Sequence, residues 1–207
     1  MRRRDSTHPR TRVGAAAAPD EDLEVMFARF LVVLAAALAL APTALAKGGS
    51  YTFDGGTPAE QAQVRAALTA SSFDFSVVPS TVTVHIAPGA DSRATPGQVW
   101  LDADLLDAGS FSWGVVQHEF AHQVDFLVLD AGARATLQAT LGGTAWCSGA
   151  AHAELGCERF ADLLAWAYWQ SPDNVMQPDS ASPVTPAAFR ALVSRLLPVR
   201  RTPQKRG

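Results

Sequence analysis

The chain carries little surplus charge of either sign. It has 17 Lys and Arg against 20 Asp and Glu, a formal net charge of −3, and only 18% of its 207 residues are charged. Residues 1–46 hold six basic and five acidic residues, so the rest of the chain has a net charge near −4. A protein that binds nucleic acid through phosphates needs a basic face. The charge balance therefore gives no indication of a nucleic-acid partner.

Long apolar runs are also scarce, and the main one lies near the N-terminus. Within residues 26–46, a basic Arg29 precedes an apolar stretch over residues 30–41 and a small-x-small sequence that ends at Ala46. The stretch is shorter than the about 20 residues needed to span a bilayer, and its order is typical of a secretory signal peptide. We therefore expect cleavage after Ala46 and a secreted or extracytoplasmic protein with no stable membrane span. A retained anchor and a buried helix are the alternatives.

The two ends of the chain do not look like parts of the folded domain. Residues 1–25 mix both signs of charge without apolar periodicity, which favours translation from Met26. We expect residues 47–198 to form a single domain, since this length suits one core of ordinary size. Residues 199–207 are predicted to be a basic tail, either frayed or in contact with an anionic envelope.

Cysteine is nearly absent, because the chain contains only Cys147 and Cys157. In an exported protein, an even and closely spaced pair favours a disulfide over free thiols. Zinc ligation by thiolate and a reduced structural pair are the alternatives. A bridge here would pin the loop that leads into the next helical segment.

Histidine is rare too, yet two of the five lie in the run His118-Glu119-Phe120-Ala121-His122. On a helix, both imidazoles lie on one face and can reach the same cation, and Glu119 lies within reach of a metal-bound water. Random placement gives this pattern in roughly 0.003 of chains of this composition. Apolar residues at helical spacing support the helix, namely Trp113, Val116, Phe120, Val124 and Leu127. The alternative is a pair of exposed histidines without a metal.

Asp125 follows His122 by three residues, which places it on the face of the helix that carries the histidines. There it could orient an imidazole or line a cleft. A solvated surface acid is the alternative.

A catalytic zinc ion needs three protein ligands and one open position, so a third donor must follow His122. The best candidate is Glu158, in an otherwise apolar helix predicted over residues 157–169, because a buried carboxylate is costly without a cation or partner. Asp162 lies one turn later and is placed to accept the free N–H of a zinc-bound histidine.

Other assignments for this part of the chain stay open. Glu158 could instead pair at the surface with Arg159 or Arg190, and Glu154 or His152 could supply the third ligand.

The remaining pattern predicts an α+β fold, with a small sheet packed on the metal-binding helix and a helical C-terminal half. Strands are expected at residues 81–86 and 98–102, and further helices at 57–70, 131–141 and from 185 onward, with residues 88–97 as a loop. The strand at 98–102 could be an edge strand that pairs with an extended peptide, or an ordinary sheet strand. His85 lies on the polar face of its strand and is expected to be exposed or hydrogen-bonded.

Two motifs carry a resemblance to known peptidases. The pattern His118-Glu119-x-x-His122 followed by Glu158-x-x-x-Asp162 resembles the gluzincin group of zinc metallopeptidases. The runs at residues 118–125 and 96–101 are similar to the Mlc titration factor peptidase family. The resemblance covers roughly residues 96–170 and implies a zincin-like fold, Zn²⁺ held by His118, His122 and Glu158, and Glu119 as general base.

The chain departs from those relatives in two respects. They are generally intracellular, whereas this chain has the features of an exported protein. The Tyr or His that steadies the oxyanion in such enzymes is not marked by a motif here, and Tyr51, His152 and Tyr168 are the candidates. The prediction is a secreted zinc metallopeptidase acting on peptides or proteins. The alternative is a zinc-binding but catalytically silent envelope or interaction module.

Overall fold

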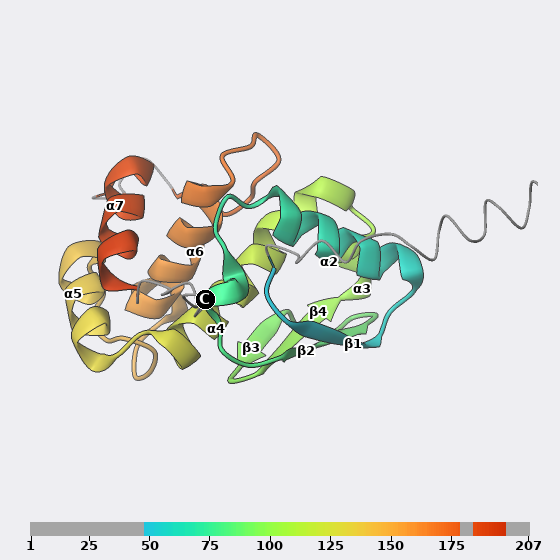
Figure 1. Cartoon of the computed structure of the whole chain (residues 1–207), viewed down its shortest axis with the longest axis horizontal. Coiled ribbons are helices and arrows are strands. Elements are labelled where there is room, and N and C mark those ends of the chain that lie inside the picture. Colours follow the sequence, from blue (N-terminus) through green and yellow to red (C-terminus); the bar gives the residue numbers. More distant parts are fainter. Residues whose placement is uncertain (1–47, 179–183, 198–207) are drawn as a thin grey trace, which may run out of the picture. The chain divides into compact units, whose positions relative to one another are not determined.

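The computed structural model describes residues 48–178 and 184–197 (Figure 1). The predicted N-terminal extension, signal peptide and basic tail lie outside these residues. The described residues belong to one compact unit. Within them, no helix combines the length and the apolar character needed to cross a membrane.

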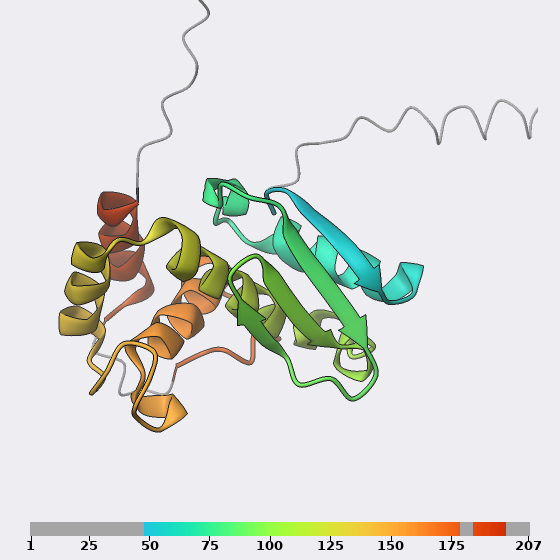
Figure 2. The same ribbon diagram turned by 90° about the horizontal axis from the view of Figure 1, so that it is seen from below.

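A four-stranded sheet forms one side of this unit (Figure 2). Its spatial order is β1 (Tyr51–Gly55), β2 (Val82–Ala87), β4 (Gln98–Asp102) and β3 (Arg93–Thr95). β1 and β4 run parallel to β2, and β3 runs antiparallel to β4. Because alternate residues of a strand point to opposite faces, one face gathers the apolar side chains. The buried ones are Val82, Val84, Ile86, Val99 and Leu101.

The other face of the sheet carries a row of four polar or aromatic side chains, one from each strand. Each residue of the row lies opposite the next one on the neighbouring strand. The row consists of Asp54, His85, Trp100 and Arg93. Nδ1 of His85 lies 2.8 Å from a carboxylate oxygen of Asp54, and the ring stacks on Trp100. The prediction of a hydrogen-bonded strand histidine is therefore confirmed for His85.

The edge of the sheet differs from the prediction. The strand at residues 98–102 exists, but it is paired on both sides, by β2 and by β3. The outer strand on the β4 side is β3, which lies within the segment that we expected to be a loop. β3 has only three residues and no alternating apolar pattern, so its sequence carried no strand signal. Gly97 has a φ of +78° in the turn that joins β3 to β4, a conformation open to glycine.

Two helices accompany the sheet. α2 (Pro58–Ala70) connects the parallel strands β1 and β2, and the short α3 (Ala103–Leu106) follows β4. The predicted capping box of α2 is present, since the backbone N–H of Thr57 donates to Glu60 and that of Glu60 donates to Thr57. Short 3₁₀-helices span Phe75–Val77, Gly109–Ser112 and His152–Glu154.

The helical half contains α4 (Trp113–Val128), α5 (Ala131–Leu141), α6 (Gly156–Tyr168) and α7 (Pro186–Leu196). α4 lies at the centre, with α2 and the sheet on one side and α6 on the other, and α5 and α7 pack against α6 (Figure 1). The chain is thus a mixed α+β protein. Two glutamines of α4 are also fully buried, Gln117 against α2, where it donates to the oxygen of Ala67, and Gln123 against the turn between β3 and β4. Apolar periodicity predicted the helix but not this burial on both sides.

Candidate metal centre

The central helix α4 supplies two imidazoles to a single point. His118 and His122 are one turn apart, and their Nε2 atoms lie 3.1 Å from each other. Both residues are buried, with exposed fractions of 7% and 6%. The two rings meet edge to face, with an angle of 81° between their planes.

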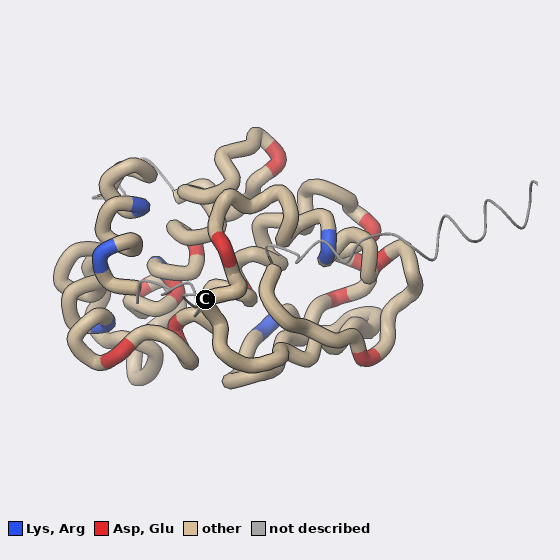
Figure 3. The backbone as a smooth tube through the Cα atoms, viewed as in Figure 1, with Lys and Arg blue, Asp and Glu red and all other residues tan. Residues whose placement is uncertain are grey.

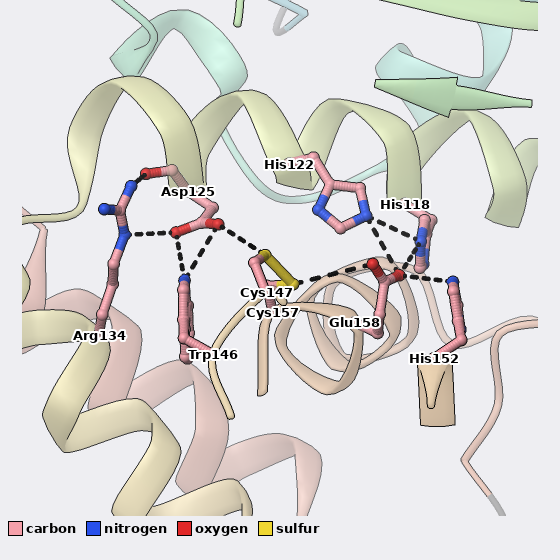
Figure 4. Close-up of a disulfide and its surroundings, with 9 residues drawn as sticks. All are labelled: His118, His122, Asp125, Arg134, Trp146, Cys147, His152, Cys157 and Glu158. Carbon is pink, nitrogen blue, oxygen red and sulfur yellow. Dashed lines mark hydrogen bonds and ion pairs between the residues drawn. A yellow bond between two sulfur atoms is a disulfide. The ribbon is translucent and has the colours of Figure 1, made fainter. Parts of the chain in front are cut away.

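The first turn of α6 adds a carboxylate to this pair. Oε2 of Glu158 lies 3.2 Å from Nε2 of His118 and 3.3 Å from Nε2 of His122 (Figure 4). The three atoms form a nearly equilateral triangle, and these three residues are a group that could hold a metal ion. The alternative of a surface ion pair is wrong. Arg159 donates to the backbone oxygens of residues 141 and 153, and Arg190 donates to that of residue 167.

Asp162 lies behind the triangle, one helical turn after Glu158. Its Oδ1 is 2.8 Å from Nδ1 of His118. A proton on Nδ1 that is donated to Asp162 leaves Nε2 free to bind a cation at the centre of the triangle. The structure thus brings Asp162 to the side of His118 that faces away from Glu158.

The charges of this cluster depend on one another. Burial alone lowers the pKa of His118, but the hydrogen bond to Asp162 and the nearby Glu158 outweigh it and raise this pKa to about 9. Burial raises the pKa of Glu158, yet the imidazoles of His118 and His122 outweigh it and hold this pKa well below its ordinary value. Without a cation, the centre therefore contains a protonated His118 against an ionised Glu158. A metal ion that binds here must displace that proton.

Glu119 is a second buried carboxyl group beside the triangle, with an exposed fraction of 5%. Burial raises its pKa above the ordinary value of 4.5, and the charges of His118 and His122 oppose this shift. A carboxyl group with a raised pKa both accepts and returns a proton near neutral pH more readily than a solvated one. Glu119 is thus a buried carboxyl group whose pKa responds to the charges of both imidazoles of the triangle.

No family model, curated protein or solved structure matches this chain.

Asp125 is buried and does not hold an imidazole. Its Oδ1 accepts hydrogen bonds from Nε of Arg134 at 2.8 Å and from Nε1 of Trp146 at 3.0 Å. With an exposed fraction of 1%, it is not a solvated acid either. Its ligand atoms lie near those of His122 and Cys157. The carboxylate, however, is engaged by Arg134 from α5 and by Trp146, so it anchors the loop after α5.

The predicted disulfide between Cys147 and Cys157 is present, which rules out zinc ligation by a free thiolate in this state. It closes the loop between α5 and α6, together with three backbone hydrogen bonds at the base of the loop. These run from the N–H groups of Thr144, Gly156 and Cys157 to the oxygens of Glu154, Ala145 and Trp146. Gly143, with a φ of +114°, permits the close approach, since a Cβ there would lie 2.9 Å from the oxygen of Glu154. The loop is therefore tied at its base directly before Glu158.

The structure distinguishes between the candidates for the third metal ligand and between those for the residue that contacts the oxyanion. Glu154 is exposed and lies outside the ligand group, whereas Nε2 of His152 lies 3.0 Å from Oε2 of Glu158. Tyr51 packs against Phe120, and Tyr168 packs against Phe73. Of the three candidates for the oxyanion, His152 alone contacts the cluster within the described part of the chain.

Sequence reasoning missed one residue that positions the site, Gln123. Its Oε1 accepts the N–H of Gly97 at 2.7 Å, and its Nε2 donates to the oxygens of Thr95 and Gln98 at 2.9 and 3.0 Å. These bonds tie the end of β3 to α4, one residue after His122. The sequence did contain a signal for this role, because Gln123 is an amide in an apolar helix directly after His122. A buried amide needs hydrogen-bond partners.

Proposed function

We propose that this chain is a zinc-dependent metallopeptidase of the gluzincin type with a zincin-like fold. His118, His122 and Glu158 would hold the ion, and Glu119 would act as general base. The observation that carries the proposal is the triangle of two imidazole nitrogens and one carboxylate oxygen. The resemblance of both motifs to gluzincins, and of residues 96–101 and 118–125 to the Mlc titration factor peptidases, supports it.

The dimensions of the triangle fit zinc. Tetrahedral zinc with bonds of about 2.0–2.1 Å separates its ligand atoms by about 3.3–3.4 Å. The observed edges are 3.1, 3.2 and 3.3 Å. Oε2 of Glu158 is also buried, and the Nε2 atoms of His118, His122 and His152 lie 3.0–3.3 Å from it, so its charge requires either a protonated imidazole or a cation at the centre of the triangle. A buried set of two histidines and one carboxylate with a position left open is typical of catalytic zinc.

The chemistry follows from the neighbours of the triangle. Zinc bound there would supply a Lewis acid for a peptide carbonyl and would lower the pKa of a water molecule toward about 7. Glu119 takes a proton from the attacking water at its carboxylate and returns it to the leaving amine, as its raised pKa allows. Asp162 keeps the ring of His118 in the tautomer that leaves Nε2 free.

An extended peptide is the substrate that the sheet suits best. β3 is the outer strand beside α4, and Gln123 holds its end one residue away from a proposed ligand. An open strand edge binds main-chain groups of a peptide and so accepts many sequences. We therefore propose that peptides or proteins pair with β3 rather than with β4, which has a strand on each side.

We further propose that the protein acts outside the cytoplasm. The segment at residues 26–46 has the order of a signal peptide. The Cys147–Cys157 disulfide supports the same location, because disulfides persist in oxidising compartments.

Metal analysis of the chain from Lys47 onward tests the ligand set. We expect about one equivalent of zinc, and a loss of metal in His118→Ala, His122→Ala and Glu158→Ala, because two remaining ligands hold zinc poorly. Glu154→Ala is the matched control, since it removes a nearby exposed carboxylate and should keep the metal. Normal zinc content in Glu158→Ala together with loss in Glu154→Ala would move the third ligand into the disulfide loop.

Digestion of a broad peptide library tests the reaction. We expect cleavage by the zinc-loaded protein and none by Glu119→Gln, which keeps the metal but cannot accept the proton. Metal binding without any cleavage would favour the silent envelope or interaction module. Full activity of Glu119→Gln would show that the proposed mechanism is wrong.

A further inference from the structure

A second group of metal-ligating side chains lies beside the proposed metal centre, on the side of the disulfide. It consists of His122, Asp125 and Cys157, whose ligand atoms all lie within 4.8 Å of one another. All three residues are buried. The group shares His122 with the proposed centre and none of that centre's other ligands. In the oxidised protein the sulfur of Cys157 is bonded to Cys147, so it is not a thiolate ligand.

One ring nitrogen of His122 points into this group. Nε2 faces His118 and Glu158, whereas Nδ1 is buried and has no hydrogen-bond partner among the described residues. Figure 4 shows Nδ1 on the side of the ring that faces the disulfide and Asp125. The side chain of His122 is only 8% exposed. A buried ring nitrogen without a partner is costly, and a metal ion at this point would satisfy it.

Two carboxylates flank the disulfide, one beside each sulfur. Sγ of Cys147 lies 3.7 Å from Oδ2 of Asp125, and Sγ of Cys157 lies 3.8 Å from Oε1 of Glu158. Arg134 donates to the other oxygen of Asp125, Oδ1, and so turns Oδ2 toward the sulfur atoms (Figure 4). Two thiolates formed here would stand next to two carboxylates. Such a concentration of negative charge favours a bound cation.

The disulfide is open to reduction from one side, because Cys147 is exposed whereas Cys157 is fully buried. A thiolate of an external dithiol attacks Sγ of Cys147, and Cys157 leaves as a thiolate that takes up a proton. The second sulfur of the dithiol then releases Cys147. The dithiol becomes a disulfide, and its two electrons and two protons end on the two cysteines. A metal ion that binds the resulting thiols displaces both protons.

We propose that reduction of this disulfide creates a second metal site in the folded protein. Its four ligands are Cys147, Cys157, Asp125 and Nδ1 of His122. Two thiolates, one carboxylate and one imidazole complete the four positions of tetrahedral zinc. With Zn–S bonds of about 2.3 Å the two sulfurs lie about 3.8 Å apart, so the S–S bond and the metal exclude one another.

The shared histidine makes the two sites compete. A neutral imidazole has one nitrogen with a free lone pair, so His122 serves one ion at a time. When Nδ1 binds the metal, the proton lies on Nε2 and the proposed metal centre loses a ligand. The disulfide is thus a redox switch, with a thiolate site in the reduced protein and the His118, His122 and Glu158 centre in the oxidised one. The switch rests on the proposed function, whereas the thiolate site does not.

Titration with Cd²⁺ tests the site, because cadmium thiolates have a sulfur-to-metal charge-transfer band in the ultraviolet. The protein is measured as purified, and again after reduction with dithiothreitol that is then removed by gel filtration without oxygen. We expect no such band from the oxidised protein, and a band that saturates at about one equivalent of Cd²⁺ from the reduced protein. Near-ultraviolet circular dichroism of the loaded, reduced protein should keep the signal of the folded state.

Variants of the histidines separate the two sites. His118→Ala removes a ligand of the proposed centre alone, so its oxidised form should bind no Cd²⁺ and its reduced form should show the full band. His122→Ala should weaken Cd²⁺ binding by the reduced protein at least about 10-fold. His85→Ala, on the outer face of the sheet, is the matched control and should behave as the wild type.

Two further variants test the other ligands. Asp125→Asn keeps the shape of the side chain but loses its charge, and it should also weaken Cd²⁺ binding by the reduced protein at least about 10-fold. Joint replacement Cys147→Ser and Cys157→Ser should remove the band. The switch predicts that the zinc-loaded protein stops cleaving peptides on reduction and recovers on reoxidation.

The outcomes separate this inference from the proposed function. A reduced protein that is folded and shows no band would overturn the thiolate site, and so would one that unfolds and does not regain its fold with Cd²⁺. A band that His122→Ala and Asp125→Asn leave unchanged would overturn the assigned ligands. Continued cleavage by the reduced, zinc-loaded protein would overturn the switch. The expected band in the reduced protein, with no metal bound by the oxidised wild type, would refute the proposed centre and leave the thiolate site standing.

Discussion

The metal-free protein should become less stable as the pH rises from about 6.5 to about 9. His118 has an ordinary pKa of 6.5, and in the folded protein its contacts with Asp162 and Glu158 raise the pKa to about 9. A raised pKa means that the folded state binds the proton more tightly. The resulting stabilisation is complete below the unfolded pKa and is lost as the pH passes through the folded pKa.

The size of this effect follows from the shift. At about 1.4 kcal/mol per pKa unit, the shift of His118 corresponds to at most about 3 kcal/mol. For a domain of this size that amounts to a decrease of roughly 6–12 °C in Tm. His118 is 7% exposed, so solvent screening reduces the value little. Calorimetry of the metal-free protein between about pH 6 and about pH 9.5 measures it.

Two controls decide whether His118 is the cause. Asp162→Asn removes the hydrogen-bonded carboxylate that raises the pKa of His118, so the variant should show a smaller loss of stability over the same pH range. Zinc should reverse the trend, because a metal-bound His118 has no proton to lose and the metal competes better as the proton leaves. A metal-free protein whose stability is constant or rises over this range would show that the folded state does not bind the proton of His118 more tightly than the unfolded state does.

Three other substitutions test the supports of the site. Asp162→Ala should lower zinc affinity by about 10- to 100-fold without abolishing it, as measured by competition with a chelator, because His118 keeps its place in α4 but loses its fixed tautomer. Asp125→Ala should reduce the free energy of unfolding by about 1–3 kcal/mol in urea titration, because the N–H groups of Arg134 and Trp146 lose their acceptor. If β3 binds the substrate, Gln123→Ala should raise KM for peptides more than it lowers kcat, because the end of β3 loses its hydrogen bonds to α4. An unchanged KM would count against pairing of the substrate with β3.

The local patterns of the sequence were enough for most helices and for the core of the candidate site. A capping box and Pro at the first position predicted α2, and apolar spacing predicted α4 and α6. The positions of His118 and His122 on one face follow from helical geometry alone. Glu158 and Asp162 stood out because two acids one turn apart in an apolar helix need a partner.

The sequence pattern did not predict the short strands β1 and β3. Three to five residues carry too little periodicity, and their pairing depends on neighbours that are distant in the chain. Because β3 was not predicted, β4 was expected at the edge of the sheet, a position that β3 takes in the structure.

Tertiary structure alone decided which polar residues join the candidate metal centre and which hold other parts of the fold together. Asp125 shares a helix face with the histidines, yet Arg134 from α5 and Trp146 from the following loop take up its carboxylate. His152 had no spacing in common with the motif and reached Glu158 only through the closed loop. Helical periodicity relates residues within one element, whereas contacts between elements depend on how the whole chain packs.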